Sequence, residues 1–156
     1  MTAPRKEDDW QERTTSIGLF NFAESYWQAA NALNKVQLKS THPDSPVAFL
    51  YYHAIELYLK AFLRMHGHRP FELASWKFGH STHRLKNRAE KLGLTFNNED
   101  LEVLSLMATT DAVNRSRYIQ TGYFRWPAPG VLDRTCKSLR KSVGSKLREK
   151  GITVRL

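Results

Sequence analysis

The chain of 156 residues has the length of one domain, and its 41% hydrophobic and 12% aromatic residues favour a globular fold over a disordered one. No apolar run approaches the roughly 18 residues that a membrane span needs, and the N-terminus lacks the apolar segment of a secretory signal. The single cysteine, Cys136, excludes an intrachain disulfide. Together these features predict a cytoplasmic protein without a membrane segment.

The net charge of +9 is concentrated at the C-terminal end of the chain. From Val131 onward eight basic residues face only two acids, Asp133 and Glu149, so this part carries six of the nine net positive charges. Clustered positive charge is typical of a surface for an anionic partner, nucleic acid first of all. The alternative is a C-terminal helix with a solvated basic face. The basic residues are Arg134, Lys137, Arg140, Lys141, Lys146, Arg148, Lys150 and Arg155.

The first elements in chain order are a polar arm and a helix. Residues 1–15 form the predicted frayed arm, and Ser16 can cap a helix over residues 17–39. Apolar residues at spacings of three and four predict its buried stripe. The stripe consists of Leu19, Phe22, Ala23, Tyr26, Ala30 and Leu33, and Trp27 and Phe20 widen this face.

The second predicted helix is central to the chain. Ser45 and Pro46 read as an N-cap followed by proline at the first helical position, and the helix runs to about Met65. It is apolar nearly all round, as expected of a helix buried on most sides. Its ionisable residues gather within a sector of roughly 60°, so they form a site, a buried structural network, or a stripe that pairs with a two-fold partner across a dimer. These residues are His53, Glu56 and Lys60.

Three further helices complete the prediction. The first of them covers residues 81–92 and ends at Gly93. The next is capped by Asn97 or Asn98 and reaches about Arg117. Its predicted buried residues are Leu101, Leu104, Ala108 and Ala112. The last covers residues 131–150, with an inward stripe of Leu132, Cys136, Leu139, Val143 and Leu147. The fold class is therefore all-α: an antiparallel bundle of four to five helices over residues 16–150, followed by a tail at 151–156.

Several stretches read together resemble the HEPN family, small all-helical domains of prokaryotic toxin–antitoxin and defence systems. The central helix carries most of the resemblance. The matching stretches are residues 25–30, residues 46–63, Gly79-His80 with Leu85 and Ala89, and Arg117-Tyr118. The resemblance implies a homodimer, often beside a nucleotidyltransferase, and in many members a metal-independent ribonuclease built on an arginine followed four to six residues later by a histidine.

The chain departs from that catalytic pattern. After Arg115 and Arg117 the expected histidine positions fall within residues 119–124, which contain no histidine, and none occurs after His83. The arginine half remains, so Arg115, Arg117 and Tyr118 predict phosphate binding with base stacking. The alternative for Arg115 is a helix-surface pair with Asp111.

The remaining candidate binding residues are basic. Arg125 lies in an aromatic loop that suits single-stranded nucleic acid or packs on its own domain, and Lys137, Arg140 and Lys141 lie on the last helix. His66, His68, His80 and His83 lack the spacing of a zinc site, so neither a metal nor a cofactor is predicted. Phosphate-loop, dinucleotide and hydrolase motifs are also absent.

Three functions follow as hypotheses. The first is an RNA- or nucleotide-binding module, non-catalytic and regulatory. The second is a metal-independent ribonuclease with a rearranged site, in which His53 or His80 supplies the base and Arg117 the cation. The third is a protein–protein interaction partner, for example of a neighbouring nucleotidyltransferase.

Overall fold

The computed structural model describes residues 13–74, 81–110 and 127–156, and within these ranges the protein is helical and has no strand. The predicted all-α class is therefore confirmed. None of the described helices combines the length and the apolar composition that crossing a bilayer requires. The helices are α2 (Ser16–Asn34), α3 (Asp44–Met65), α4 (Pro70–Ala74), α5 (Thr82–Lys91), α6 (Asn98–Thr110) and α8 (Pro129–Glu149).

The start and end of α2 differ from the prediction. Its N-cap is Thr15, whose hydroxyl accepts a hydrogen bond from the Gly18 amide at 3.0 Å, so Ser16 is the first helical residue instead of the cap. The helix ends at Asn34, five residues before the predicted end at Lys39. The next apolar residue, Val36, is 58% exposed, so nothing there holds a further helical turn against the core.

The connection from α5 to α6 forms as the sequence predicted. Gly93 has a φ of 98°, and the amides of Gly93 and Leu94 donate to the carbonyls of Glu90 and Ala89, each at 3.0 Å, as in a Schellman motif. The Asp100 amide then donates to the Asn97 side chain at 2.8 Å, which makes Asn97 the cap of α6.

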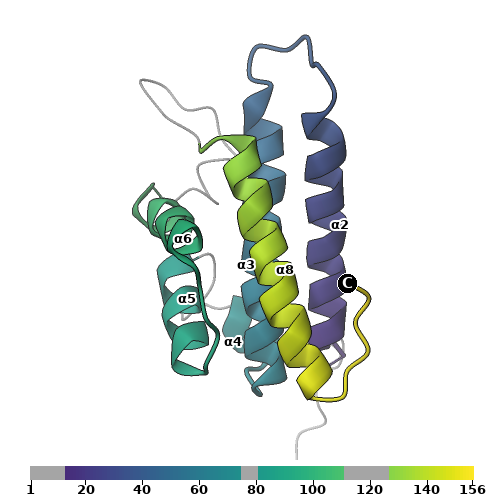
Figure 1. The fold of residues 1–156 in the computed structure, drawn as a ribbon, viewed down its shortest axis with the longest axis vertical. Coiled ribbons are helices and arrows are strands. Elements are labelled where there is room, and N and C mark those ends of the chain that lie inside the picture. The colour runs from purple at the N-terminus through teal and green to yellow at the C-terminus, as the bar shows by residue number, and fades with distance from the viewer. Residues whose placement is uncertain (1–12, 75–80, 111–126) are drawn as a thin grey trace, which may run out of the picture.

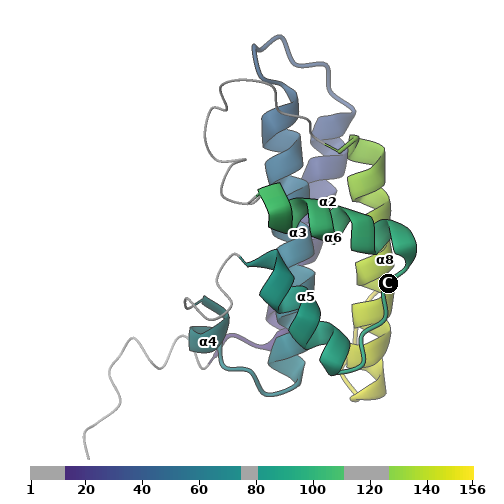
Figure 2. The same ribbon diagram turned by 90° about the vertical axis from the view of Figure 1, so that its left-hand side faces the viewer.

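Helix α3 is the centre of the molecule, with α2 and α8 along one side and the α4–α6 segment along the other (Figures 1 and 2). α2 runs opposite to α3, but α8 runs in the same direction as α3. The starts of these two helices line one cavity, through Asp44 and Ala48 on α3 and Leu132 on α8. The predicted fully antiparallel arrangement therefore differs for this pair, because the segment between α3 and α8 returns the chain to the end where α3 begins (Figure 1).

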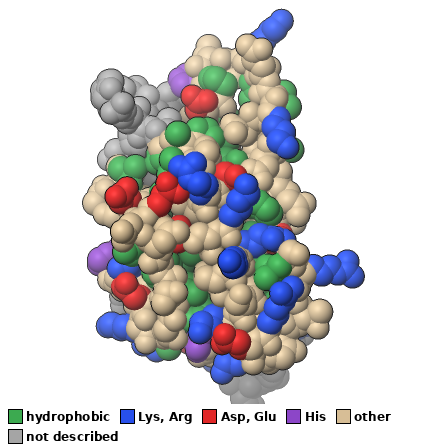
Figure 3. Space-filling view, viewed as in Figure 1, with side chains coloured by type: hydrophobic (Ala, Val, Ile, Leu, Met, Phe, Trp, Pro, Cys, Tyr) green, Lys and Arg blue, Asp and Glu red, His purple; other side chains and the backbone are tan. Residues whose placement is uncertain are grey.

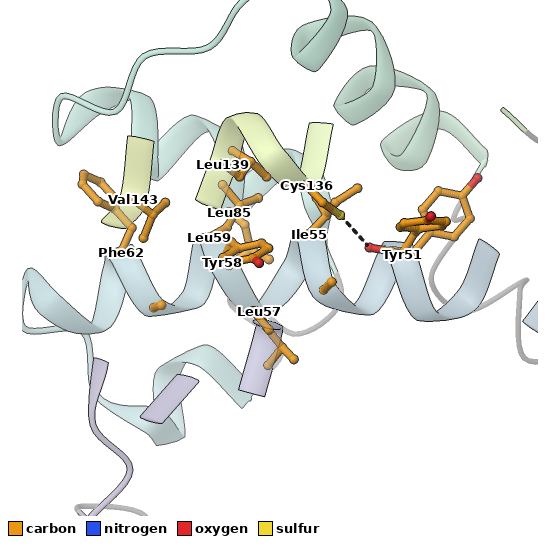
Figure 4. Close-up of a cluster of buried hydrophobic side chains, with 14 of the residues drawn as sticks. Tyr51, Ile55, Leu57, Tyr58, Leu59, Phe62, Leu85, Cys136, Leu139 and Val143 are labelled. Carbon is orange, nitrogen blue, oxygen red and sulfur yellow. Dashed lines mark hydrogen bonds between the residues drawn. The ribbon is translucent and has the colours of Figure 1, made fainter. Parts of the chain in front are cut away.

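The core surrounds α3 and includes buried residues of α2, α5, α6 and α8; Figure 4 shows the part where α3 meets α5 and α8. The predicted inward stripe of α8 is confirmed, since all five of its residues are buried. The Cys136 thiol contacts the Tyr51 carbonyl at 3.8 Å, and burial raises the pKa of this thiol well above its usual range. Cys136 is thus a small core residue and not a nucleophile. The fully buried α3 residues include Tyr51, Ile55, Tyr58, Leu59 and Phe62.

The inward face of α6 is rotated from the predicted one. α6 buries Asp100, Val103, Leu104 and Met107, whereas Leu101 and Ala108 are only half-buried. The rotation is set by polar contacts, because Asp100 accepts a hydrogen bond from Ser138 of α8 at 2.6 Å and so turns its own side of α6 inward. Ala112 lies outside the described residues.

A similar difference occurs on α2. Phe22, which the sequence placed in the buried stripe, is 50% exposed, whereas Phe20, which the sequence placed beside that stripe on the same face, is buried as predicted, at 1% exposure. Phe20 packs edge-on against the Tyr58 ring at a centroid distance of 5.4 Å. An aromatic side chain of α2 is therefore left on the surface.

The C-terminal residues 151–156 fold back along α8. Arg148 donates two hydrogen bonds to the Val154 carbonyl, at 2.7 and 3.1 Å, and Val154 is buried. Leu156 lies over Gly144, where a Cβ atom would come within 2.8 Å of the leucine side chain. Gly144 therefore gives this tail room to pack.

Candidate functional site

The polar stripe predicted on α3 is divided into two environments. Glu56 is only 2% exposed and forms an i, i+4 ion pair with Lys60, with 2.5 Å between the ammonium nitrogen and a carboxylate oxygen. The glutamate precedes the lysine, which is the favourable orientation for such a pair on a helix. This half of the stripe is a nearly buried ion pair that fits the structural alternative.

His53, in the other half of the stripe, lies among aromatic rings. It stacks on Phe49 with a centroid distance of 5.9 Å and an interplanar angle of 5°, and Tyr26 meets it edge-on at 4.3 Å. The half-exposed Phe22 ring is 6.3 Å away. We call Phe22, Tyr26, Phe49 and His53 the aromatic cluster. It forms on the α2–α3 side, and its environment does not favour His53 as a catalytic base.

Two of the three predicted α8 binding residues make ion pairs. Lys137 pairs with Asp133 one turn earlier at 2.8 Å, and Arg140 pairs with Glu24 of α2 at 2.8 Å. Lys141 is exposed. The same pattern extends to Arg134, which donates two hydrogen bonds to Glu99 at 2.8 and 3.0 Å. The basic C-terminal helix is therefore attached to its neighbours by ion pairs.

Glu24 and Trp27 on α2 were not among the predicted site residues, although the sequence placed Trp27 on the inward face of this helix. Glu24 accepts hydrogen bonds from the Tyr58 hydroxyl and from Arg140, so a single carboxylate joins α2, α3 and α8. The Arg140 guanidinium lies over the Trp27 ring at 5.3 Å, a cation–π geometry, and the Trp27 indole donates to Asp133 at 2.8 Å. We call Glu24, Trp27, Tyr58, Asp133 and Arg140 the three-helix network.

The contacts in and around the network shift the pKa values of Asp133 and Tyr51. Burial alone would raise the pKa of Asp133, but hydrogen bonds from Lys137 and Trp27 outweigh it and lower that pKa. Burial, with the charge of Asp133 and with Cys136, raises the pKa of the nearby Tyr51 to about 12. Asp133 is thus held as a carboxylate and Tyr51 as a neutral phenol near pH 7.

In these pairs the acids lie deeper than the cations. The side chain of Asp133 is 20% exposed against 60% for Lys137, and that of Glu24 is 13% exposed against 25% for Arg140. Each pair therefore presents its positive end outward. The resulting surface shows Lys and Arg side chains over α8 in the space-filling view (Figure 3).

The other predicted phosphate-binding residues fall outside the described part of the chain. Arg115, Arg117, Tyr118 and Arg125 belong to the range 111–126, as His80 belongs to 75–80. Their roles stay predictions.

The described histidines do not form a metal site, since no group of three or more candidate ligands occurs among the residues that the structure describes. His68 instead ties α4 to α5. Its Nδ1 atom lies 3.1 Å from Glu72, and its Nε2 atom accepts a hydrogen bond from Arg88 at 3.0 Å. Because Arg88 can only donate, the neutral form of His68 carries its hydrogen on Nδ1 and donates it to Glu72.

His66 provides a pH prediction. Burial, together with the charges of Lys150, His68, Arg88 and Lys146, lowers its pKa below the value of about 6.5 expected in the unfolded chain. The neutral imidazole therefore contributes stability that is present above about pH 6.5 and is lost as the pH falls through the folded-state pKa. A His66→Asn variant should lose less stability than the parent between about pH 7.5 and pH 5.

Urea denaturation at the two pH values measures this difference, and NMR titration of the His66 ring measures the pKa itself. His83→Asn, at an exposed position of α5, is the control and should follow the parent. A His66 ring that titrates at or above its unfolded value would contradict the prediction.

Comparison with protein-family models, with curated proteins and with solved structures found no match to this chain. The HEPN resemblance accordingly rests on the sequence stretches quoted above.

Proposed function

We propose that this protein binds RNA or a nucleotide without cleaving it, and that the outward-facing cations of α8 contact the phosphate groups. One observation carries the proposal: in the Lys137–Asp133 and Arg140–Glu24 pairs the acid lies beneath the cation, whereas the Lys146–Glu149 pair near the end of α8 has the opposite order. A phosphate that approaches this surface meets Lys137, Arg140 and Lys141 before it meets Asp133 or Glu24. The proposed contact also includes the arginine and aromatic residues predicted at 111–126. The proposal further includes the HEPN-like bundle and the homodimer that the resemblance implies.

The ribonuclease alternative gains no support from the described residues. It needs a base, and His53 is surrounded by the aromatic rings of Phe22, Tyr26 and Phe49. The interaction-partner alternative does have a specific observation in its favour, because Phe22 exposes half of its surface at the edge of that same cluster. RNA binding and the interaction-partner alternative predict different effects of a charge change on α8: the first should be weakened by it and the second should not.

A Lys137→Glu/Lys141→Glu double variant should bind a single-stranded RNA of about 12 nucleotides at least tenfold more weakly than the parent. If each lysine neutralises one phosphate, the slope of log affinity against log salt should fall by about 1.4 in magnitude, because the corresponding counterions are no longer released. Fluorescence anisotropy between about 50 and 200 mM salt measures both quantities.

The matched control is Lys35→Glu/Lys39→Glu in the connection between α2 and α3, which changes the net charge by the same amount. This control variant should keep most of the parent's RNA affinity and the parent's slope of log affinity against log salt, because its α8 surface is unchanged. Equal losses in both double variants would mean that only net charge matters. Absence of binding by the parent at about 50 mM salt would reject RNA binding and favour the interaction-partner alternative, for which the charge change on α8 is neutral.

A further inference from the structure

Part of the apolar surface of α6 is not used by the core. Because Asp100, Val103 and Met107 face inward, the half-buried Leu101 and Ala108 point instead toward α5. They line a groove of about 520 Å³ between the two helices, on the side of the molecule that Figure 2 presents. This volume is within the range of about 300–1,000 Å³ typical of small-molecule sites.

The groove combines an apolar floor with polar walls that contain no acidic residue among the described lining residues. Leu101, Leu104 and Ala108 form the floor, and Ser105 and Thr109 add hydroxyl groups from α6. The α5 wall consists of His83, whose Nε2 atom is 3.0 Å from the Asn87 amide, and Lys86.

Lys86 is a partly exposed residue of the α5 wall. Its side chain is 24% exposed, and it forms an i, i+4 pair with Glu90 at 2.9 Å. Glu90 lies one turn further along α5, is half-exposed and does not line the groove. An exposed pair of this kind is weak enough for Lys86 to turn to a ligand anion.

We propose that the α5–α6 groove binds a small organic anion with an apolar body, a carboxylate or a sulfonate. Its apolar part lies on Leu101, Leu104 and Ala108, and its anionic group meets Lys86 and His83. This site is separate from the α8 surface, so it stands or falls independently of RNA binding.

The probe for the test is 1-anilinonaphthalene-8-sulfonate, an aromatic sulfonate whose fluorescence rises in apolar surroundings. We expect saturable binding to the full chain and displacement by octanoate. Ala108→Trp, which fills the groove, should weaken binding at least tenfold. Lys86→Met, which keeps the side-chain length and removes the charge, should weaken it about tenfold. The controls Ala29→Trp and Lys39→Met, at exposed positions outside the groove, should bind as the parent does.

Ser105→Trp provides a second blocking variant at an exposed position of α6, in case Ala108→Trp does not fold. Thermal melts establish which variants keep the parent fold. An unchanged affinity in the folded blocking variants would overturn the proposal. So would an equal loss in Ala29→Trp, or a failure of octanoate to displace the probe.

Discussion

A Leu59→Asp variant is expected to lose the cooperative thermal transition of the parent. Leu59 is fully buried on α3, at the point where that helix packs on its neighbours. A carboxylate without a partner in that position costs about 3–5 kcal/mol, a large part of the total of about 5–15 kcal/mol that stabilises a domain of this kind. Circular dichroism at 222 nm during heating detects the loss.

The control places the same substitution on an apolar residue at the surface. Val36, which is 58% exposed in the connection after α2, should accept aspartate with a change of no more than about 0.5 kcal/mol. If Leu59→Asp melted cooperatively near the parent's temperature, α3 would not be the buried centre of the fold.

The second large effect is expected at Glu24. Replacing it with alanine leaves Arg140 and the Tyr58 hydroxyl without their shared acceptor, and should lower the free energy of unfolding by about 2–3 kcal/mol. This figure lies below that for a fully buried pair because the Arg140 side chain is 25% exposed. Urea denaturation at pH 7 measures the change.

A double-mutant cycle with Arg140→Ala isolates the ion pair. The coupling energy between Glu24→Ala and Arg140→Ala should be about 1–3 kcal/mol, because the two side chains contact each other. Glu149→Ala removes an exposed pair with Lys146, at 3.5 Å, and should cost no more than about 1 kcal/mol. Additive effects of the Glu24 and Arg140 substitutions would mean that the three-helix network is not an energetic unit.

The helices were predictable where a long apolar repeat dominates. The α3 segment is apolar on nearly every side, and the α8 stripe repeats at three and four residues from Leu132 to Leu147, so any packing of these helices buries the same positions. The caps at Gly93 and Asn97 were predictable for a related reason. A glycine such as Gly93 and a cap such as Asn97 act on backbone groups only a few residues away. The predictions of Ser16 and Ser45 as N-caps were wrong, because Thr15 caps α2 and α3 begins at Asp44 after Pro43, without a side-chain cap.

Choices between nearly equivalent faces were not predictable from periodicity. On α6 the buried face is set by the contact of Asp100 with Ser138, which are 38 residues apart in sequence. On α2 the sequence placed both Phe20 and Phe22 on the inward face, and which of the two is buried depends on where the Tyr58 ring lies. The sequence contains the interacting groups, but their meeting depends on how the helices are placed in three dimensions.

In the candidate site, too, some features were predictable from the sequence and others were not. The positive charge of the last helix was evident from the sequence, but its pairing was not, because Glu24 and Arg140 are 116 residues apart. Only the structure shows that Asp133 and Glu24 lie beneath Lys137 and Arg140, and this arrangement makes that part of α8 a candidate phosphate-binding surface.

The most direct test of that surface is an NMR titration of the ¹⁵N-labelled protein with a single-stranded RNA of about 12 nucleotides at about 50 mM salt. We predict that the largest shifts occur at the amides of Lys137, Arg140 and Lys141 and at the Trp27 indole, which lies beneath Arg140. RNA that binds and shifts only signals of other helices, leaving these four unchanged, would contradict the proposed role of α8.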